Sequence, residues 1–298
     1  MPDPLVGTVL AKALGTEGAQ SEKAATGLFV RVLGPSADEI GEALRRYTAY
    51  RLRNVGRIVS NADAKAGDSG EEVIVNPRVA RVLVEEGSYC DDDLMTNYLG
   101  GVLAGSRTHD GRDDRAVTWS RLITDLSGLQ VRAHYLLYRE WAARLEGIVP
   151  FNLGDSKIVE RAVMQIDLEE FNPELARGSG VDYIRATPHA IIGLAGANLI
   201  DDSYALGRSR RLLSKGAGVR SSFTMTLEVR PSRQGIELYG WAQGLPGLLP
   251  AEFTSEAVPF DLGDPISRLT KVNLPNLGRY SGKVMSATPY HCVAPKGC

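Results

Sequence analysis

Residues 76–106 read NPRVARVLVEEGSYCDDDLMTNYLGGVLAGS, and this stretch decides the fold class because it contains two helix starts. Asn76-Pro77 is a strong start, since asparagine caps free amides and proline fits the first helical position. The first helix is expected to end near Gly87, and residues 88–91 (SYCD), beginning with Ser88, are a second capping signal. That second helix has an acidic first turn, Asp91 to Asp93, which suits the positive end of the helix dipole. The stretch therefore predicts two consecutive helices.

The chain before this stretch is also predicted to be helical, with short helices at 4–14 and 20–33. Gly34-Pro35 is expected to interrupt the pattern. A capping box at 36–39 (SADE) then starts a further helix that runs to about Ala64. Its apolar residues recur at mostly helical spacing, which predicts a buried stripe: Ile40, Leu44, Tyr47, Leu52, Val55 and Val59.

After residue 106 the helical pattern continues and then changes. A charged loop is followed by a long predicted helix at 117–145, with a break near Gly128. Beyond 147–150 (GIVP), glycine and proline become frequent and the helical periodicity weakens. The C-terminal part is therefore expected to differ in architecture from the N-terminal part.

The clearest strand signal lies at 223–229 (FTMTLEV), where apolar and polar residues alternate. A polar turn at 230–235 and a second strand at 236–241 complete a predicted hairpin. An apolar helix is predicted before it, at 188–200. A winged-helix-like arrangement is one alternative, and it requires residues 158–171 to be helical and to pack across that apolar helix.

We therefore expect a mainly α N-terminal helical bundle and a smaller α+β C-terminal region with a helix and a β-hairpin. The predicted units are a helical domain at 1–147, an α+β domain at 148–260 and an irregular tail at 261–298. The chain has 298 residues, with 34 basic and 36 acidic side chains, so its formal net charge is −2. This balance excludes disorder and any global attraction to nucleic acid or membranes.

Three cysteines, Cys90, Cys292 and Cys298, are too few for a disulfide framework and suit a reduced protein. The first residues lack the basic start of a signal peptide, and no apolar run approaches the ~18 residues of a membrane span. We expect a cytoplasmic protein without a membrane partner. The histidines show no ligand spacing, and His134 is expected to be a hydrogen-bonded, partly buried residue of its helix.

No nucleotide-binding, zinc-protease or serine-hydrolase motif occurs in the sequence. We therefore predict no catalytic residue, no cofactor and no metal site. Charged clusters instead define a candidate interaction surface, because basic stripes contact phosphates or acidic partners and acidic turns contact basic ones. Its residues are Arg46, Arg53, Arg57, Asp92, Asp93, Arg208, Arg210, Arg211, Arg230 and Arg233.

Two stretches carry a family resemblance. The first is LGPSADEIGEALRRYTAYRLRNVGRIV at 33–59, followed by the 76–106 stretch with its EEGS and DDL elements; the second is GIELYGWAQG at 235–244. In this order they resemble the Abi-alpha (abortive infection alpha) family. The resemblance implies a bacterial or mobile-element protein that protects a population against phage, often by arresting or killing the infected cell. It transfers no catalytic residues.

Three functional hypotheses follow. The first is a non-enzymatic sensor, adaptor or effector of anti-phage defence that binds a protein partner, either a phage component or a co-encoded defence protein; self-association is a further option. The second is a nucleic-acid-binding module that uses the basic segment 208–215 and the hairpin tip 230–235. The third is a metal-dependent nuclease, which needs two acidic clusters to meet in space: 91–93, 110–114 or 201–202.

Overall fold

The computed structural model describes residues 19–66, 73–145, 155–180, 182–211, 222–248, 252–253 and 269–275, with side chains at 19–40, 156, 183, 208–211 and 222–223 outside the description. The chain divides into two compact units, Met1–Arg53 and Asn54–Cys298. The described part contains mostly helices and two small antiparallel sheets, so the expected fold class is confirmed. None of the described helices is long and apolar enough to cross a bilayer.

The first described element is a single helix, α2 (Ala19–Ala66), which continues through Gly34 and Pro35. The predicted interruption is therefore wrong. A proline removes one helical hydrogen bond, but the segments on both sides favour helix strongly enough to continue. The short helix predicted at 4–14 lies outside the described residues.

Four of the six residues of the apolar stripe predicted on α2 are exposed, Val55 is half-buried, and the side chain of Ile40 lies outside the described residues. Leu44 is 61% exposed and Leu52 is 66% exposed, and Tyr47 and Val59 are also exposed. Periodicity shows which residues share a face, but burial requires another element to cover that face. Within the second unit the buried residues of α2 are instead Asn54, Ile58 and Ala62, spaced four apart.

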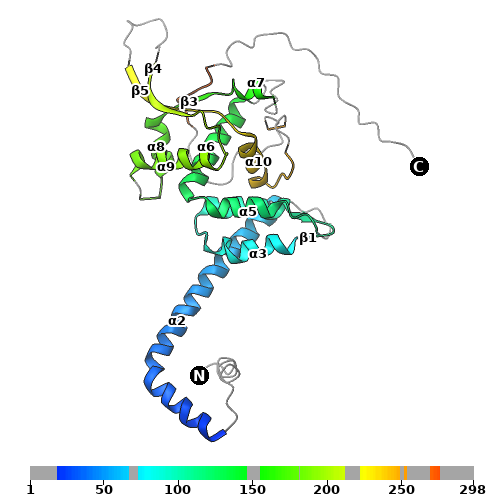
Figure 1. Ribbon diagram of the computed structural model, residues 1–298, viewed down its shortest axis with the longest axis vertical. Coiled ribbons are helices and arrows are strands. Elements are labelled where there is room, and N and C mark those ends of the chain that lie inside the picture. Colours follow the sequence, from blue (N-terminus) through cyan, green and yellow to red (C-terminus); the bar gives the residue numbers. More distant parts are fainter. Residues whose placement is uncertain are drawn as a thin grey trace, which may run out of the picture. The chain divides into compact units, whose positions relative to one another are not determined.

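The N-terminal half of the second unit is a helical layer (Figure 1). It comprises α3 (Pro77–Glu85), the 3-10 helix η1 (Gly87–Tyr89), α4 (Asp93–Gly105), α5 (Ala116–Asp125) and α6 (Gly128–Leu145). Two short strands, β1 (Ile74–Val75) and β2 (Arg107–Thr108), pair antiparallel beside them. The predicted break near Gly128 is confirmed, since α5 and α6 are separate helices.

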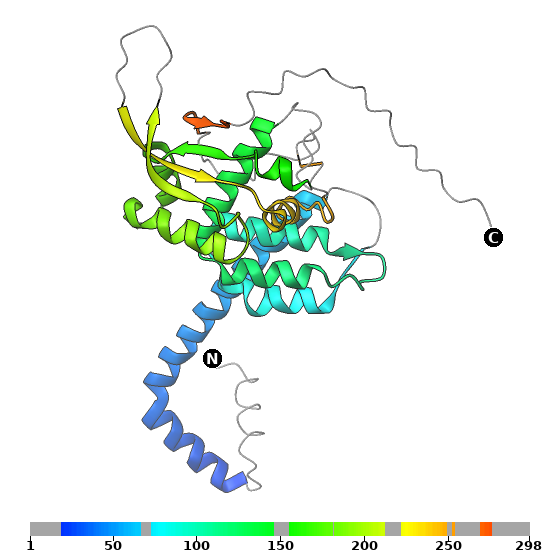
Figure 2. The same ribbon diagram turned by 45° about the horizontal axis from the view of Figure 1, so that its top comes forward.

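The C-terminal half adds a four-stranded antiparallel sheet in the order β4-β5-β3-β6. Its strands are β3 (Met164–Asp167), β4 (Ala205–Arg211), β5 (Ser222–Val229) and β6 (Val272–Asn273). Helices α7 (Ser156–Val159), α8 (Leu168–Ala176) and α9 (Tyr183–Gly196) come from the same region. Figures 1 and 2 show α8 and α9 on one side of the sheet, and α9 also packs on α6.

The predicted hairpin is wrong in its second strand. Residues 236–241 belong to a helix, α10 (Arg233–Ala242), which Ser232 caps by accepting a hydrogen bond from the Gly235 N–H at 3.0 Å. The observed hairpin pairs β5 with β4, and its connection, 212–221, lies outside the described residues. Residues 158–171 contain β3, so the condition for a winged-helix-like arrangement is not met.

One apolar core joins the helical layer to the sheet and contains residues from Ile58 to Leu269. His134 lies within it at 0% exposure. Its Nε2 donates to the Gly235 carbonyl at 3.0 Å, and its Nδ1 accepts from the Tyr98 hydroxyl at 2.8 Å. The expected hydrogen-bonded histidine is confirmed, and its burial is complete. Burial also lowers the pKa of His134 to about 3.

Candidate functional site

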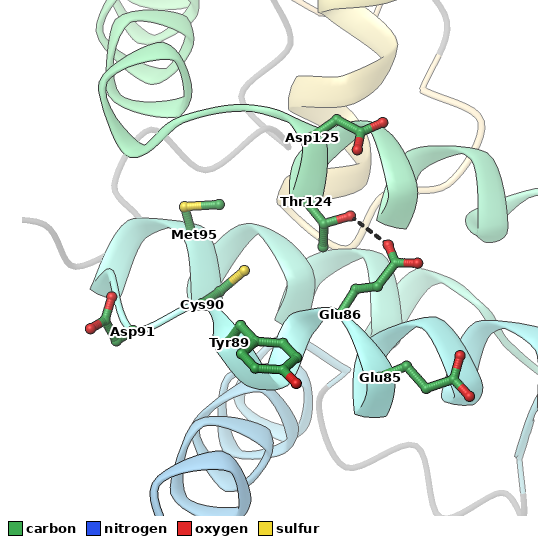
Figure 3. Close-up of a pocket in the computed structure, with 8 residues that line it drawn as sticks. All are labelled: Glu85, Glu86, Tyr89, Cys90, Asp91, Met95, Thr124 and Asp125. Carbon is green, nitrogen blue, oxygen red and sulfur yellow. Dashed lines mark hydrogen bonds between the residues drawn. The ribbon is translucent and has the colours of Figure 1, made fainter. Parts of the chain in front are cut away.

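A pocket of about 470 Å³ lies where α3, η1, α4 and α5 meet (Figure 3). We call it the acidic pocket, because four of its eight lining residues carry carboxylates and no lysine or arginine is among the described residues that line it. The lining residues are Glu85, Glu86, Tyr89, Cys90, Asp91, Met95, Thr124 and Asp125.

Local capping interactions build the walls of the acidic pocket. The Asn76 side chain accepts from the Arg78 N–H at 2.9 Å and starts α3, which ends at Glu85. Asp92 caps α4 by accepting from the Met95 N–H at 2.9 Å. The turn between these two helices therefore brings Glu86, Tyr89, Cys90 and Asp91 to one side of the pocket, opposite the end of α5 (Figure 3).

The charge of the acidic pocket is not explained by helix stability. Helices α3 and α5 end in Glu85 and Asp125, yet a helix C-terminus is the negative end of the dipole and favours basic side chains. Glu85 pairs with Arg81 at 2.9 Å. Among the described residues, no lysine or arginine forms an ion pair with Glu86, Asp91 or Asp125. The pocket therefore concentrates negative potential and attracts cations.

Apolar and aromatic atoms complete the lining. Tyr89 is 51% exposed at the pocket, and Met95 is buried beneath it. Burial and the nearby carboxylates, chiefly Asp91, raise the pKa of the Cys90 thiol to about 11, so the thiol is protonated at neutral pH. Cys90 is therefore a weak nucleophile here. The lining suits the alkyl stem and charged head of a lysine or arginine.

Three of the residues predicted for the interaction surface come together beside this pocket. Arg57 forms an ion pair with Asp93 and donates to the Asp91 carbonyl at 2.9 Å. Asp92 is the cap of α4, and its other oxygen lies 4.0 Å from Arg132. These contacts tie α2 to the start of α4, so Arg57 and Asp93 largely neutralise one another.

Two further predicted residues lie in the first unit. Arg46 pairs with Glu42 at 3.6 Å, and the Arg53 guanidinium lies 5.7 Å from the centroid of the Tyr50 ring. Both contacts are local to α2. They are typical of a solvent-exposed helix face, because ion pairs three or four residues apart are common there.

The remaining predicted residues do not form a hairpin tip. Arg208 and Arg210 lie on β4, where the register places them opposite Met225 and Phe223, and Arg211 is the last residue of that strand. Arg230 donates to the Ser203 carbonyl at 3.0 Å, and Arg233 begins α10 and pairs with Glu237 at 3.0 Å. The assignment of 230–235 to a tip is therefore wrong, because those residues start a helix.

Two further pockets have no signal in the sequence. One, of about 640 Å³, is lined by Arg78, Arg115 and Arg121 among others, and one of about 420 Å³ shares Arg115 and lies beside Trp119 and Trp241. Two of these arginines already have carboxylate partners: Arg78 pairs with Asp114, and Arg115 with Asp113. The residues come from separate helices, so no spacing along the chain reveals them.

No group of three or more histidine, cysteine or acidic residues lies close enough to hold a metal ion within the described ranges. The meeting of two acidic clusters that the nuclease hypothesis needs is thus not observed there. The chain matches no protein-family model, and neither a curated protein nor a solved structure is detectably similar to it.

Proposed function

We propose that this chain is a protein-recognition module whose acidic pocket takes a lysine or arginine side chain of a partner protein. The observation that carries the proposal is the placing of two carboxylates, Glu86 and Asp125, at the C-terminal ends of α3 and α5 around an exposed tyrosine, without an ion pair to a described lysine or arginine. Glu86 accepts a hydrogen bond from the Thr124 hydroxyl at 3.0 Å, which leaves its charge uncompensated. Helix stability disfavours that placement, and cation binding accounts for it. The sequence shows no catalytic motif, which agrees with a binding role.

The Glu86→Gln/Asp125→Asn variant is expected to bind a short basic peptide, acetyl-Lys-Arg-Leu-Lys-amide, about three- to tenfold more weakly than the unaltered protein. Each exposed ion pair contributes roughly 0.2–1 kcal/mol, so two carboxylates account for a change of this size. Calorimetric titration at low salt measures it.

The matched control is Glu160→Gln/Asp202→Asn, which removes two exposed carboxylates that lie between elements outside the acidic pocket and changes the net charge equally. Its affinity should equal that of the unaltered protein. If both variants lose the same affinity, binding follows net charge and the acidic pocket is not the site.

We place this recognition in anti-phage defence in the cytoplasm, with a phage component or a co-encoded defence protein as partner; the support is the resemblance described above together with the cysteine usage. Cells that carry the gene are expected to survive phage at low multiplicity of infection and to collapse at high multiplicity. The Glu86→Gln/Asp125→Asn variant should lose this protection. If the variant still protects the cells, the defence role does not depend on the acidic pocket.

The alternative is a nucleic-acid-binding module. The observation that favours it is the end of β4, which contains Arg208, Arg210 and Arg211 and pairs with residues 222–225 of β5. This part of β5 lies beyond its pairing with β3, so here the sheet continues as a two-stranded ribbon. A ribbon of this kind fits the major groove. Binding of duplex DNA that falls steeply with salt and is lost in Arg208→Ala/Arg210→Ala would favour this alternative.

A further inference from the structure

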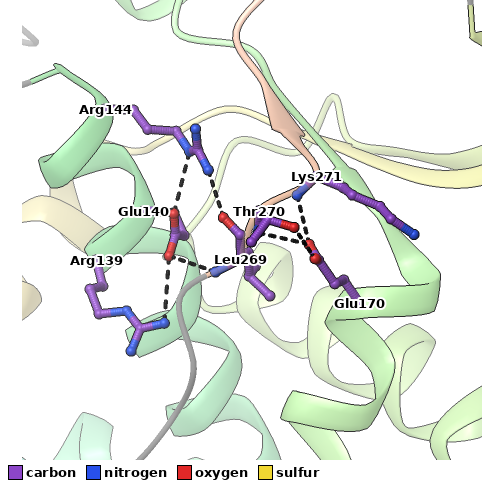
Figure 4. Close-up of polar contacts among 7 residues, drawn as sticks. All are labelled: Arg139, Glu140, Arg144, Glu170, Leu269, Thr270 and Lys271. Carbon is purple, nitrogen blue, oxygen red and sulfur yellow. Dashed lines mark hydrogen bonds and ion pairs between the residues drawn. The ribbon is translucent and has the colours of Figure 1, made fainter.

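Charged side chains of α6 and α8 hold a separate, extended piece of the chain at residues 269–273 (Figure 4). The holding residues are Glu140 and Arg144 on α6 and Glu170 on α8. Together with Asp167, Glu169 and the adjoining edge of β3, we call them the strand seat. It shares no residue with the acidic pocket.

The strand seat recognises the backbone of its occupant. Glu140 accepts from the Leu269 N–H at 3.2 Å, and Arg144 donates to the Leu269 carbonyl at 2.7 Å. Glu170 accepts from the N–H groups of Thr270 at 2.9 Å and Lys271 at 2.7 Å. Every amino acid except proline offers these backbone groups, so the contacts require an extended strand and not a particular sequence.

Strand pairing extends this backbone recognition. β6 adds to β3 antiparallel, with Ile166 opposite Val272 and Gln165 opposite Asn273. The Asp167 N–H also donates to the Lys271 carbonyl at 3.2 Å. Addition of an extended segment to the edge of a sheet is a recurring way to bind peptides, in which main-chain bonds supply affinity and side-chain pockets supply selectivity.

Two side chains of the occupant give the selectivity. Leu269 is only 2% exposed and enters the apolar core. The Lys271 Nζ lies 3.7 Å from an Asp167 carboxylate oxygen and 3.6 Å from a Glu169 oxygen. The segment in the seat therefore presents a buried apolar residue followed two positions later by a basic one that lies beside two carboxylates.

Stability alone does not explain the buried carboxylate of the seat. The Glu140 side chain is fully buried, with Arg144 at 3.3 Å and Arg139 at 3.5 Å. The free energy needed to remove an ion pair from water is about as large as the electrostatic attraction between its charges. Apolar residues of similar volume stabilise a core equally well or better. A buried charge that reaches the backbone of another segment instead specifies which segment binds there.

We propose that the strand seat is a peptide-binding site for a partner protein, whose extended segment carries an apolar residue followed two positions later by lysine or arginine. The chain's own residues 269–273 occupy it in cis. The acidic side chains around Lys271 complement the basic residue of the partner, and the apolar core receives its apolar residue. To bind, the partner segment must replace the chain's own residues 269–273. Its affinity for the seat must therefore be high enough to compete with a segment of the same chain.

The test uses the full chain and a fluorescein-labelled peptide of residues 267–276, SRLTKVNLPN. In the Leu269→Asp/Lys271→Glu variant the chain's own segment no longer fits, so the peptide should bind about tenfold more tightly than it binds the unaltered chain, because a tethered competitor has been removed. Fluorescence anisotropy measures both affinities. A peptide with glutamate in place of its lysine should bind the variant several-fold more weakly.

Thr270→Pro provides an independent variant, because it removes one N–H that Glu170 accepts and leaves Leu269 and Lys271 unchanged. It should raise the peptide affinity in the same direction, and adding Glu170→Gln should reverse the gain. Circular dichroism reports whether each variant folds. Folded variants that bind the peptide no more tightly than the unaltered chain would overturn the proposal. Dimer formation is a further outcome. If the unaltered chain forms concentration-dependent dimers and both variants stay monomeric, the segment of a second copy occupies the seat, and the assignment to a partner protein is overturned.

Discussion

The Gly101→Ala variant is expected to lose about 3 kcal/mol of unfolding free energy, because α4 and α10 approach each other at this residue without room for a side chain. A Cβ atom at Gly101 would overlap the carbonyl carbon and oxygen of Ala242 and would lie 2.7 Å from the Trp241 carbonyl oxygen. These are backbone atoms, so no side-chain rotation relieves the overlap. The Ala242 carbonyl also accepts from Lys65 Nζ at 2.7 Å, and displacement of α10 would break that bond.

Gly56→Ala is the matched control. Gly56 lies on α2 with nothing within 4 Å of a Cβ atom built there. In an exposed helical position the same substitution should stabilise the protein by about 0.5–1 kcal/mol, since alanine has the higher helix propensity. Urea unfolding followed by circular dichroism compares the two variants. Equal midpoints for Gly101→Ala and the unaltered protein would contradict the close approach of α4 and α10.

The features predicted correctly from the sequence are those with local causes. Asn76 caps α3 as predicted, because its side-chain oxygen reaches an amide two residues along the chain. The second predicted cap is displaced by four residues, since Ser88 lies in η1 and Asp92 caps α4 instead. The break between α5 and α6 is similarly local. Such signals require only a few neighbouring residues, so tertiary packing rarely overrides them.

The error at α10 shows where local patterns are ambiguous. Residues 236–241, IELYGW, fit strand alternation, but Ile236 and Tyr239 are also three apart and both are fully buried on a helix. Ser232 caps this helix, and the polar residues around it fit a turn between strands equally well. The true partner of β5 is β4, whose sequence ALGRSRR contains no β-branched or aromatic residue and so gave no strand signal.

Function is harder to predict because its residues meet only in the folded chain. Glu86 and Asp125 line one pocket from α3 and α5, and Glu140 and Glu170 hold one strand from α6 and α8. The acidic first turn of α4 did indicate this part of the molecule. Its prominent charge, Asp93, is nevertheless paired with Arg57, while the carboxylates that face the pocket lie on neighbouring helix ends.

Acidification is expected to destabilise the protein through His134. The Gly235 carbonyl can only accept, so Nε2 carries the proton of the neutral ring and Nδ1 accepts from the Tyr98 hydroxyl. Protonation of Nδ1 would remove that acceptor and place a charge in the core. Since burial lowers the folded-state pKa of His134 to about 3 while an unfolded histidine titrates near 6.5, protons bind the unfolded chain more strongly throughout this interval. The contribution of His134 is therefore complete above pH 6.5 and falls as the pH drops toward 3, by at most about 1.4 kcal/mol per pH unit.

A difference between variants isolates this effect from the carboxylates, which also titrate in acid. The His134→Asn variant is expected to be less stable at pH 7.5, because an asparagine is too short to reach both partners, but its stability should fall less steeply between pH 6.5 and pH 5. Over that interval the unaltered protein should lose about 1.6 kcal/mol more than the variant. His109→Gln, at an exposed loop position, should keep the slope of the unaltered protein. Urea unfolding at each pH measures these slopes. If the unfolding free energies of all three proteins change equally with pH, His134 is not held neutral in the core, and the assignment of its two hydrogen bonds is wrong.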